Sequence, residues 1–407
     1  MTNTADPAVE SGLRVTIVNT SFAPDILGGA ERSVGELADE LRRRGHYVTV
    51  VCLGRRGDTV IQDEGRLIRI PSRAYEHLLK AQRGAAGKAL WHVTELFRVV
   101  TAVRLRRVFR ADRPDVVHFN NLAGFGWLAW LVARPFASVQ TFRDYALLCT
   151  SATGQHGDRI CRSDHPRCRV LKWPFKLRGL RPDVATAVSA YTASRHVEGH
   201  LTDAQGRVDV VYNSPLSTTP RSHSTTEHTV PVIGFIGRVA FDKGIAVLFD
   251  AFRRVHQQHQ CSLLVAGPVS ADDRGRLEEG YGDLLSKGAV RLAGPMTADD
   301  FYSQVDVVAV PTQWQEPFGR VAAEALMAGT PLLYSRVGGL PEVAELYGGT
   351  STAVDDAANA ESWADALQRA FDGRFDTASA ALAGPSPSTD EYLLCYREAI
   401  ARHRART

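Results

Sequence analysis

Short apolar runs alternate with longer amphipathic segments along the first half of the chain. Residues 13–19, LRVTIVN, have the composition of a buried strand. After them Val34, Leu37 and Leu41 recur at helical spacing, until Gly45, which is placed to end the helix. Further apolar runs of strand length occupy residues 47–53, 115–119, 137–142, 184–189 and 208–213. Strands that alternate with helices in this way predict a parallel sheet covered by helices on both faces.

A change of composition separates this pattern from a second occurrence of it. Residues 214–230 are rich in Ser, Thr, Pro and His, which is typical of a linker. The alternation then restarts, with strand-length runs at 232–237, 262–267, 289–294, 306–311 and 331–335. A chain of 407 residues is long enough for two hydrophobic cores. We therefore predict an α/β protein with two Rossmann-like, doubly wound parallel-sheet domains, at residues 12–213 and 231–387, and a final helical segment at 388–407.

Charge is unevenly distributed, although the net charge is only +3. A net charge this small gives no ground for nucleic-acid binding. Lys and Arg outnumber acidic residues by twelve to three in residues 66–113 and by eight to one in residues 159–181. Both runs lie in the first domain. We interpret them as solvated helix surface or, alternatively, as a surface that attracts an anionic membrane or a phosphorylated acceptor.

The N-terminal residues and the cysteine content bear on location. Residues 1–12 are polar and lack the apolar stretch of a signal peptide, and the longest apolar run, 122–133, is too short to span a bilayer. We therefore expect a cytoplasmic protein, membrane-associated at most peripherally, with its six cysteines mostly reduced.

Three of the cysteines, Cys149, Cys161 and Cys168, are clustered in the sequence, with His156 and His165 between them. Their spacing does not match a zinc finger or a zinc ribbon. Thiols or an occasional disulfide are favoured over a zinc site, and the sequence predicts no metal.

Polar residues at two strand ends of the second domain are candidates for ligand binding. Arg238 directly follows the run 232–237, and Lys243 comes five positions later, before the next helix. Ligands of doubly wound sheets bind beyond the carboxyl ends of the strands, where two cations suit a diphosphate. Each charge-assisted hydrogen bond there contributes roughly 1.5–3 kcal/mol. A surface cation pair near a turn is the alternative for this stretch taken alone.

The stretch PTQWQEPFGRVAAEALMAGTP, residues 311–331, changes that balance. A helix begins after Gly319 and offers a phosphate its unpaired backbone N–H groups and its positive dipole end. Glu324, about a turn inside, would repel a phosphate but suits the vicinal diol of a ribose. Glu316, in the loop before the helix, is placed to accept from another hydroxyl-rich group. A diphosphate with a diol on each side is a nucleotide-sugar, which we therefore predict as the ligand. This interpretation is favoured over the alternative that the two glutamates are solvated acids.

The chain also resembles the retaining family-four glycosyltransferases of the GT-B fold. The resemblance covers nearly the whole chain and rests on GGAE, IGRVAFDKG, EPFGRVAAEALMAGTP and VGGLPEV, at residues 28–31, 236–244, 316–331 and 337–343. It implies two domains that face a central cleft, with the acceptor on the first domain, the donor on the second, and the last helix crossing back. It further implies hexosyl transfer with retention of configuration, from a UDP- or GDP-linked sugar to a glycan, glycolipid or cyclitol hydroxyl.

The resemblance assigns roles to particular residues. Arg238 and Lys243 would hold the diphosphate and stabilise the leaving group, and Glu316 would hold the donor sugar, so these three are the predicted catalytic residues. Other predicted donor-binding residues are Gly237, Pro317, Phe318, Gly319, Arg320, Val321 and Glu324. No divalent metal and no other cofactor would be required, in agreement with the absence of an Asp-x-Asp sequence. Stabilisation of the departing nucleoside diphosphate would be electrostatic.

On the acceptor side the chain departs from the family pattern. Many members have His-x-His where this chain has His118-Phe119-Asn120, and many have His where it has Arg143. The predicted acceptor-side residues are Gly28, Gly29, His118, Asn120 and Arg143, with a structural role for His118 left open. An arginine suits an anionic or polyhydroxyl acceptor. If Arg143 is buried, it needs Asp144 or the acceptor as its partner.

Two other functions share the predicted layout. A GT-B sugar-nucleotide epimerase would keep the nucleotide site but would not need the acceptor loop at Gly28 and Gly29. A family member that couples or binds a non-sugar cyclitol nucleotide is the second alternative, and Arg143 is compatible with it.

Overall fold

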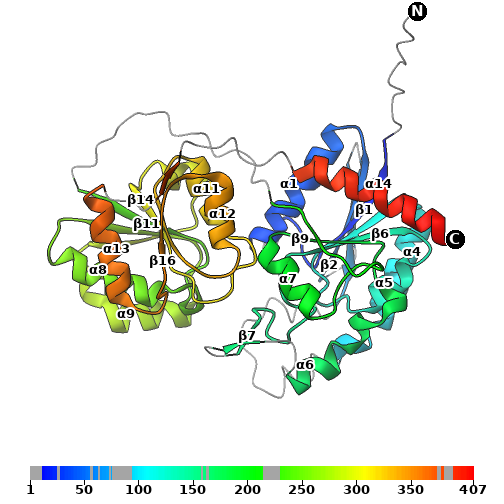
Figure 1. Ribbon diagram of the computed structural model, residues 1–407, viewed down its shortest axis with the longest axis horizontal. Coiled ribbons are helices and arrows are strands. Elements are labelled where there is room, and N and C mark those ends of the chain that lie inside the picture. Colours follow the sequence, from blue (N-terminus) through cyan, green and yellow to red (C-terminus); the bar gives the residue numbers. More distant parts are fainter. Residues whose placement is uncertain are drawn as a thin grey trace, which may run out of the picture.

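The strands assemble into two large sheets, one in each half of the chain (Figure 1). The computed structural model describes residues 12–24, 28–55, 58–62, 65–72, 75, 94–156, 159–161, 165–213, 230–373, 377–379 and 388–407. The predicted linker, apart from residue 230, lies outside these residues.

The first sheet has the strand order β10-β9-β6-β5-β1-β2-β4-β3. Its strands are β1 (Arg14–Val18), β2 (Tyr47–Gly54), β3 (Asp58–Gln62), β4 (Gly65–Pro71), β5 (Val116–Phe119), β6 (Ala137–Phe142), β9 (Val184–Ala187) and β10 (Asp209–Val210). The helices of this half are α1 (Gly29–Arg43), α4 (Val99–Asp112), α5 (Leu128–Ala133), α6 (Pro166–Leu171) and α7 (Ala190–Glu198). Two 3₁₀ helices, η1 (Trp173–Lys176) and η2 (Arg178–Leu180), and a small hairpin of β7 (Gln155–His156) and β8 (Arg159–Ile160) lie between β6 and β9.

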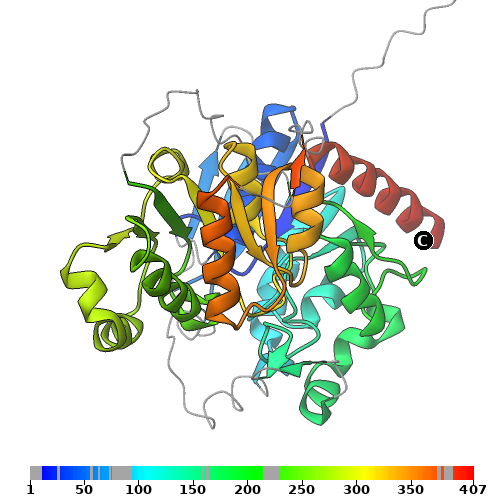
Figure 2. The same cartoon turned by 60° about the vertical axis from the view of Figure 1, so that its left-hand side comes forward.

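The second sheet has the order β13-β12-β11-β14-β15-β16-β17. Its strands are β11 (Val232–Ile236), β12 (Ser262–Ala266), β13 (Val290–Gly294), β14 (Val307–Val310), β15 (Leu332–Ser335), β16 (Gly349–Val354) and β17 (Thr377–Ser379). The helices are η3 (Phe241–Lys243), α8 (Ile245–His256), α9 (Ala271–Ser286), α10 (Ala298–Tyr302), α11 (Arg320–Met327), α12 (Leu340–Tyr347) and α13 (Ala360–Phe371). In Figure 2, α13 lies in front of the strands of this sheet.

The prediction of two doubly wound α/β domains is confirmed, with one difference at an edge of each sheet. β3 pairs with β4, and β17 pairs with β16, in antiparallel orientation, whereas all other strand pairs of the two sheets are parallel. Only two residues separate β3 from β4, and so short a connection cannot carry a chain back to pair in parallel. The apolar pattern of the sequence predicts the buried central strands better than the edge strands β3 and β17.

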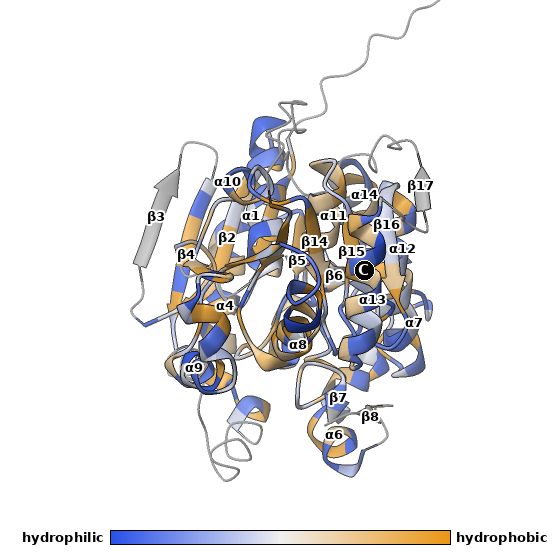
Figure 3. Cartoon of the chain, turned by 90° about the vertical axis from the view of Figure 1, so that its left-hand side faces the viewer, coloured by the Kyte–Doolittle hydropathy of each residue, from blue (hydrophilic) through white to orange (hydrophobic). Residues whose placement is uncertain are grey.

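Hydrophobic residues concentrate in the strands and in the helix faces that cover them, and in Figure 3 the hydrophobic colouring follows central strands such as β14. The burial of apolar side chains on both faces explains why most predicted strands are continuous apolar runs. Among the helices that the structure describes, none combines the length and the apolar character that crossing a bilayer would require.

The last helix, α14 (Ser388–Arg406), packs against the first sheet and lies beside α1 in Figure 1. Tyr392 and Tyr396 of this helix are buried in the same hydrophobic cluster as strand residues of β1 and β2. Arg402 Nη1 lies 2.7 Å from Asp203 Oδ2, so an ion pair fastens the end of the helix as well. The end of the chain therefore contributes side chains to the interior of the first domain.

Candidate active site

The predicted donor-side residues lie at the centre of the second sheet. β11 and β14 are neighbours there, but the chain continues from β11 to β12 on one side and from β14 to β15 on the other. Ligands of doubly wound sheets bind at such a switch point, beyond the carboxyl ends of the strands. Arg238 follows β11, and Glu316 lies in the loop after β14. The two sequence motifs that were predicted to share a ligand therefore start from adjacent strands.

Lys243 and Glu316 form an ion pair across this point. Lys243 ends η3, and its Nζ lies 2.7 Å from Glu316 Oε2 and 4.6 Å from the centre of the Trp314 ring. The two side chains are only 25% and 18% exposed. The contact joins two motifs that are 73 residues apart in the sequence.

A glycine positions this lysine. Gly244 follows Lys243 and has φ 75°, in the left-handed region that favours glycine. A Cβ atom at Gly244 would lie 1.7 Å from the carbonyl oxygen of Pro311, at the start of the loop after β14. The turn that carries Lys243 can therefore pack onto that loop only because this residue has no side chain.

Arg238 has a more open environment. Its Nη2 lies 2.7 Å from Asp242 Oδ2, and 54% of its side chain is exposed. Gly237, before it, donates its backbone N–H to the carbonyl oxygen of Ala266 on β12, at 2.9 Å. Arg238 thus lies at the surface beside the turn that carries Lys243, and its side chain pairs with an acid of that same turn.

The helix predicted after Gly319 is present as α11, which begins at Arg320. Gly319 is its N-cap with φ 95°, and a Cβ atom there would lie 2.3 Å from Leu340 Cδ2. The first N–H groups of an α-helix have no acceptor within the helix. The Pro-Phe-Gly corner therefore ends in backbone donors that can meet an anion.

The corner is fixed from both sides. The carbonyl oxygen of Pro317 accepts from Ser189 Oγ at 2.5 Å and from Thr192 Oγ1 at 2.9 Å, and both hydroxyls belong to the start of α7 in the first domain. Phe318 is buried in the core of the second domain. Further along, Val321 accepts at its carbonyl from the Tyr302 hydroxyl at 3.2 Å.

Arg320 links Glu324, which was predicted to bind the ribose, to the first domain. Its Nε lies 2.6 Å from Oε1 of Glu324, which is buried in α11. Its Nη1 lies 2.7 Å from Glu36 Oε2 and 3.1 Å from Ser33 Oγ, both on α1. A donor contact of Arg320 stays a prediction, because the contacts it makes here are with Glu324 and with α1.

The predicted acceptor-side residues lie around the corresponding switch point of the first sheet, where β1 and β5 are neighbours. Gly28 and Gly29 lie at the start of α1, in the connection after β1, and Asn120 follows β5. A Cβ atom at Gly29 would lie 3.4 Å from Arg320 Cδ. The glycine loop therefore lies against the start of α11, where the two domains meet.

Arg143, after β6, is buried among neutral groups. Its Nε lies 2.6 Å from Asn120 Oδ1, its Nη1 2.5 Å from Asn213 Oδ1, and its Nη2 3.2 Å from the Tyr392 hydroxyl on α14. Of the two partners considered from the sequence, Asp144 is not among these contacts, and the acceptor as a partner of Arg143 stays a prediction. The Asp144 carboxylate instead accepts from the backbone N–H of Ala146 at 2.8 Å.

His118 lies inside the first domain. It is 0% exposed, and its Nδ1 and Nε2 lie 2.8 Å from the Tyr396 hydroxyl and 2.7 Å from Thr141 Oγ1. Burial, and secondarily the charge of Arg143, hold the pKa of His118 well below its usual range. Of the two roles left open by the sequence, this geometry favours the structural one.

Two acids lie beside the glycine loop and Arg143. Glu31, from the GGAE sequence, is buried next to Ser21, and burial raises its pKa. Burial likewise raises the pKa of Asp144 to about 6. Acids with raised pKa values are frequent in functional sites. The sequence assigned a site role to neither acid, although Glu31 lies within a quoted motif.

Glu342 is another residue without a predicted role. It belongs to the VGGLPEV sequence and lies in the first turn of α12. Its carboxylate accepts from the backbone N–H groups of Ala190 and Tyr191 at 2.7 and 2.8 Å. Glu342 therefore caps α7 of the other domain, a contact for which the sequence carries no local signal.

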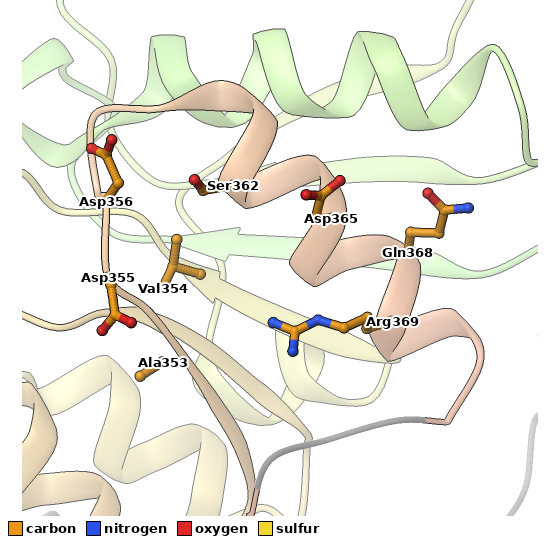
Figure 4. Close-up of a pocket in the computed structure, with 8 residues that line it drawn as sticks. All are labelled: Ala353, Val354, Asp355, Asp356, Ser362, Asp365, Gln368 and Arg369. Carbon is orange, nitrogen blue, oxygen red and sulfur yellow. The ribbon is translucent and has the colours of Figure 1, made fainter.

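A separate pocket of about 550 Å³ lies between the end of β16 and α13 (Figure 4). It is lined by Ala353, Val354, Asp355, Asp356, Ser362, Asp365, Gln368 and Arg369. None of the predicted site residues is among them. Asp355, Asp356 and Asp365 give this pocket an acidic lining, which is unsuited to a diphosphate.

The chain matches two family models that together span most of its length. Residues 27–214 match the model described as "Glycosyltransferase Family 4", and residues 218–381 match the one described as "Glycosyl transferases group 1". The chain is a family-four glycosyltransferase of the GT-B fold. It is a hexosyltransferase-type enzyme.

Known proteins agree with this membership. The glycosyltransferase is 30% identical over 357 residues to a Klebsiella pneumoniae protein described as an "Uncharacterized 42.6 kDa protein in cps region", covering 82% of this chain and 88% of that one. It is 24% identical over 409 residues to the glycogen synthase of Mycobacterium tuberculosis, covering 91% and 93%. The crystal structure of Anabaena HepE in complex with UDP and glucose superposes with a TM-score of 0.62 at 17% identity, covering 97% and 98%.

The raised pKa of Asp144 predicts a pH-dependent stability. Between the usual aspartate pKa, about 3.9, and about 6, the folded glycosyltransferase holds this proton more tightly than the unfolded chain. Its stability contribution therefore falls as pH rises through this window. Asp144→Asn removes the ionisation and keeps an oxygen for the Ala146 N–H. The melting temperature of the variant minus that of wild type should rise from pH 4 to pH 7 and then level off.

The matched control is Asp272→Asn, at an exposed position in the first turn of α9. Its melting temperature relative to wild type should not follow this profile. A difference between Asp144→Asn and wild type that stays constant from pH 4 to pH 7 would show that Asp144 ionises normally in the folded protein.

Proposed function

We propose that this glycosyltransferase moves a hexosyl group from a UDP- or GDP-linked sugar to a hydroxyl acceptor, with retention of the anomeric configuration. The observation that carries the proposal is the Lys243–Glu316 ion pair, beside the helix that begins after Gly319. A cation, a carboxylate and backbone N–H donors match the diphosphate and the sugar hydroxyls of such a donor. The presence of UDP and glucose in the HepE structure supports this class of donor.

The diphosphate would bind between Lys243 and the first N–H groups of α11. These N–H groups belong to the positive end of the helix dipole and favour an anion. Arg238, at the surface beside the Lys243 turn, can reach the diphosphate by leaving Asp242, since an exposed ion pair of this kind contributes only about 0–1 kcal/mol. Lys243 would then exchange part of its interaction with Glu316 for the phosphates, and Glu316 would accept from a sugar hydroxyl.

Glu324 would bind the ribose. A carboxylate has lone pairs for several donors, so its oxygens can accept from ribose hydroxyls while Oε1 keeps its contact with Arg320. Through Arg320 the same carboxylate is linked to Glu36 of the first domain. Donor binding would thus be coupled to the contact between the domains.

The acceptor would bind beside the glycine loop of the first domain. Gly28 and Gly29 have no side chains, so the backbone of their loop can approach a ligand closely, and Glu31 and Asp144 supply carboxyl groups that can hold hydroxyls. Arg143 adds a positive charge, and its hydrogen-bond partners among the described residues are neutral groups. A polyhydroxyl or anionic acceptor fits this combination. Asn120 would act by orienting Arg143.

The first function test measures transfer in the presence of EDTA. The positive field of Arg238, Lys243 and the helix start takes the place of a divalent ion at the diphosphate, so we expect no requirement for magnesium or manganese. UDP- and GDP-hexoses would be incubated with hexoses, short glycans or myo-inositol, and nucleoside diphosphate release and product would be followed by NMR. We expect an acceptor glycoside that keeps the donor's anomeric configuration.

Loss of transfer in EDTA, with recovery on addition of magnesium or manganese, would contradict metal independence. Inversion at the anomeric carbon would contradict the retaining mode. Conversion of the donor into an epimer without glycosylation of any acceptor would favour the sugar-nucleotide epimerase instead.

A second prediction concerns the ribose. Glu324→Gln should weaken binding of UDP or GDP at least about tenfold, since one charge-assisted hydrogen bond contributes roughly 1.5–3 kcal/mol. Calorimetric titration measures the affinity directly. Glu278→Gln, at an exposed position of α9, is the matched control and should leave it unchanged. Equal affinities of wild type and Glu324→Gln would remove Glu324 from the donor site.

The basic first domain would also contact an anionic membrane. Val170 and Trp173, near the junction of α6 and η1, are 70% and 59% exposed, and Arg167 and Arg169 beside them are exposed as well. Apolar side chains next to cations suit the interface of an anionic bilayer.

We expect the protein to sediment with vesicles that contain phosphatidylglycerol and less with neutral phosphatidylcholine vesicles. Val170→Ser with Trp173→Ser should reduce sedimentation with the anionic vesicles. Leu394→Ser, which changes an exposed apolar residue of α14, should not. Equal sedimentation of all three proteins would exclude α6 and η1 as the contact.

A further inference from the structure

Three cysteine side chains converge in the connection between β6 and β9. Cys149 lies in the loop after β6, Cys161 follows β8, and Cys168 lies in α6. All three are buried, and their Sγ atoms all lie within 4.8 Å of one another. Three different segments thus bring their thiols to one point.

These distances between the Sγ atoms suit a single metal ion bound by all three thiols. A tetrahedral zinc ion with Zn–S bonds of about 2.3 Å holds its sulfur atoms about 3.8 Å apart. The three sulfur atoms therefore need only a small contraction to bind one ion. We propose that Cys149, Cys161 and Cys168 bind a single Zn²⁺ ion as thiolates, with one nitrogen or oxygen ligand in the fourth position. On binding, each thiol releases its proton to the solvent and forms one Zn–S bond.

Hydroxyl groups lie beside two of the three sulfur atoms. Ser151 Oγ lies 3.0 Å from Cys149 Sγ, and Thr150 Oγ1 lies 3.7 Å from Cys168 Sγ, so both can donate to thiolates. Such outer hydrogen bonds orient the ligands of metal sites. The two hydroxyls can thus stabilise part of the negative charge that three thiolates would carry around a divalent cation.

The segment that carries the thiols has little regular structure of its own. Between β6 and β9 the described elements are a hairpin of two-residue strands, the six-residue α6 and two 3₁₀ helices. Arg195 of α7 donates to the carbonyl oxygen of Cys161 and ties one point of the segment to the domain. A long connection of this kind gains a fixed arrangement when an ion joins three of its points.

The position of the site indicates a structural role. The backbone N–H of Cys149 donates to the carbonyl oxygen of Tyr145 at 2.7 Å, so the thiol is attached to the turn that follows Arg143 and Asp144. Gln155, at the start of the hairpin, donates to the carbonyl oxygen of Gln313 in the second domain at 3.2 Å. Zinc would therefore hold the loop that borders the acceptor side. The sequence spacing argued against zinc because it assumed ligands presented by one local zinc-finger or ribbon unit.

The test uses the full-length protein, purified under reducing conditions from zinc-supplemented medium. Elemental analysis should find about one zinc per chain, and X-ray absorption should show three sulfur atoms at about 2.3 Å and one lighter ligand. Cys149→Ser, Cys161→Ser and Cys168→Ser should each lower the zinc content. Cys261→Ser, which alters a buried thiol of the second domain, should retain it.

If a cysteine variant does not fold, the wild-type protein still provides a test. Titration with p-hydroxymercuribenzoate should release zinc to a chromogenic chelator as the thiols react. Zinc-free protein that takes up no zinc, zinc retained by Cys161→Ser and Cys168→Ser, or a disulfide between two of these cysteines under reducing conditions would each overturn the proposal. A magnesium or manganese requirement for transfer would concern the donor site, because thiolates select thiophilic ions.

Discussion

Parallel pairing brings the carboxyl ends of neighbouring strands to one edge of a sheet, and the candidate site depends on this constraint in both domains. In the second sheet it places the turn of Lys243 next to the loop of Glu316, and the two side chains meet at 2.7 Å. In the first sheet it places the glycine loop near Asn120. Residues that are distant in the sequence can share one ligand because their strands are adjacent.

The domain contact is built from the same loops. Arg320, the first residue of α11, holds Glu324 with one edge of its guanidinium group and α1 with the other. Pro317, two positions before the helix cap, accepts from Ser189 and Thr192 of the first domain. Any change in the position of α11 on donor binding would therefore act directly on the contact between the domains. This arrangement gives a physical route by which the donor can influence the acceptor side.

Much of the architecture around the candidate donor site could be predicted from the sequence because it rests on local signals. Apolar runs located the central strands, and Gly319 and Glu324 were assigned from their places at a helix start. The antiparallel edges were missed because an apolar pattern does not encode strand direction: the two-residue connection sets the direction of β3 against β4, whereas β16 and β17 are separated by α13. The partners of Arg143 and His118 could not be predicted. Tyr392 and Tyr396 lie 249 and 278 residues further along the chain, and they reach Arg143 and His118 only because α14 packs against the first sheet. The convergence of the three thiols likewise requires the folded β6–β9 connection.

The most direct test of the central claim is a crystal structure with an intact UDP- or GDP-hexose. We expect the diphosphate at the first N–H groups of α11, within hydrogen-bond distance of Lys243, with a ribose hydroxyl on Glu324 and a sugar hydroxyl on Glu316. A diphosphate bound away from α11, with the Lys243–Glu316 pair unchanged, would contradict the assignment of the donor site.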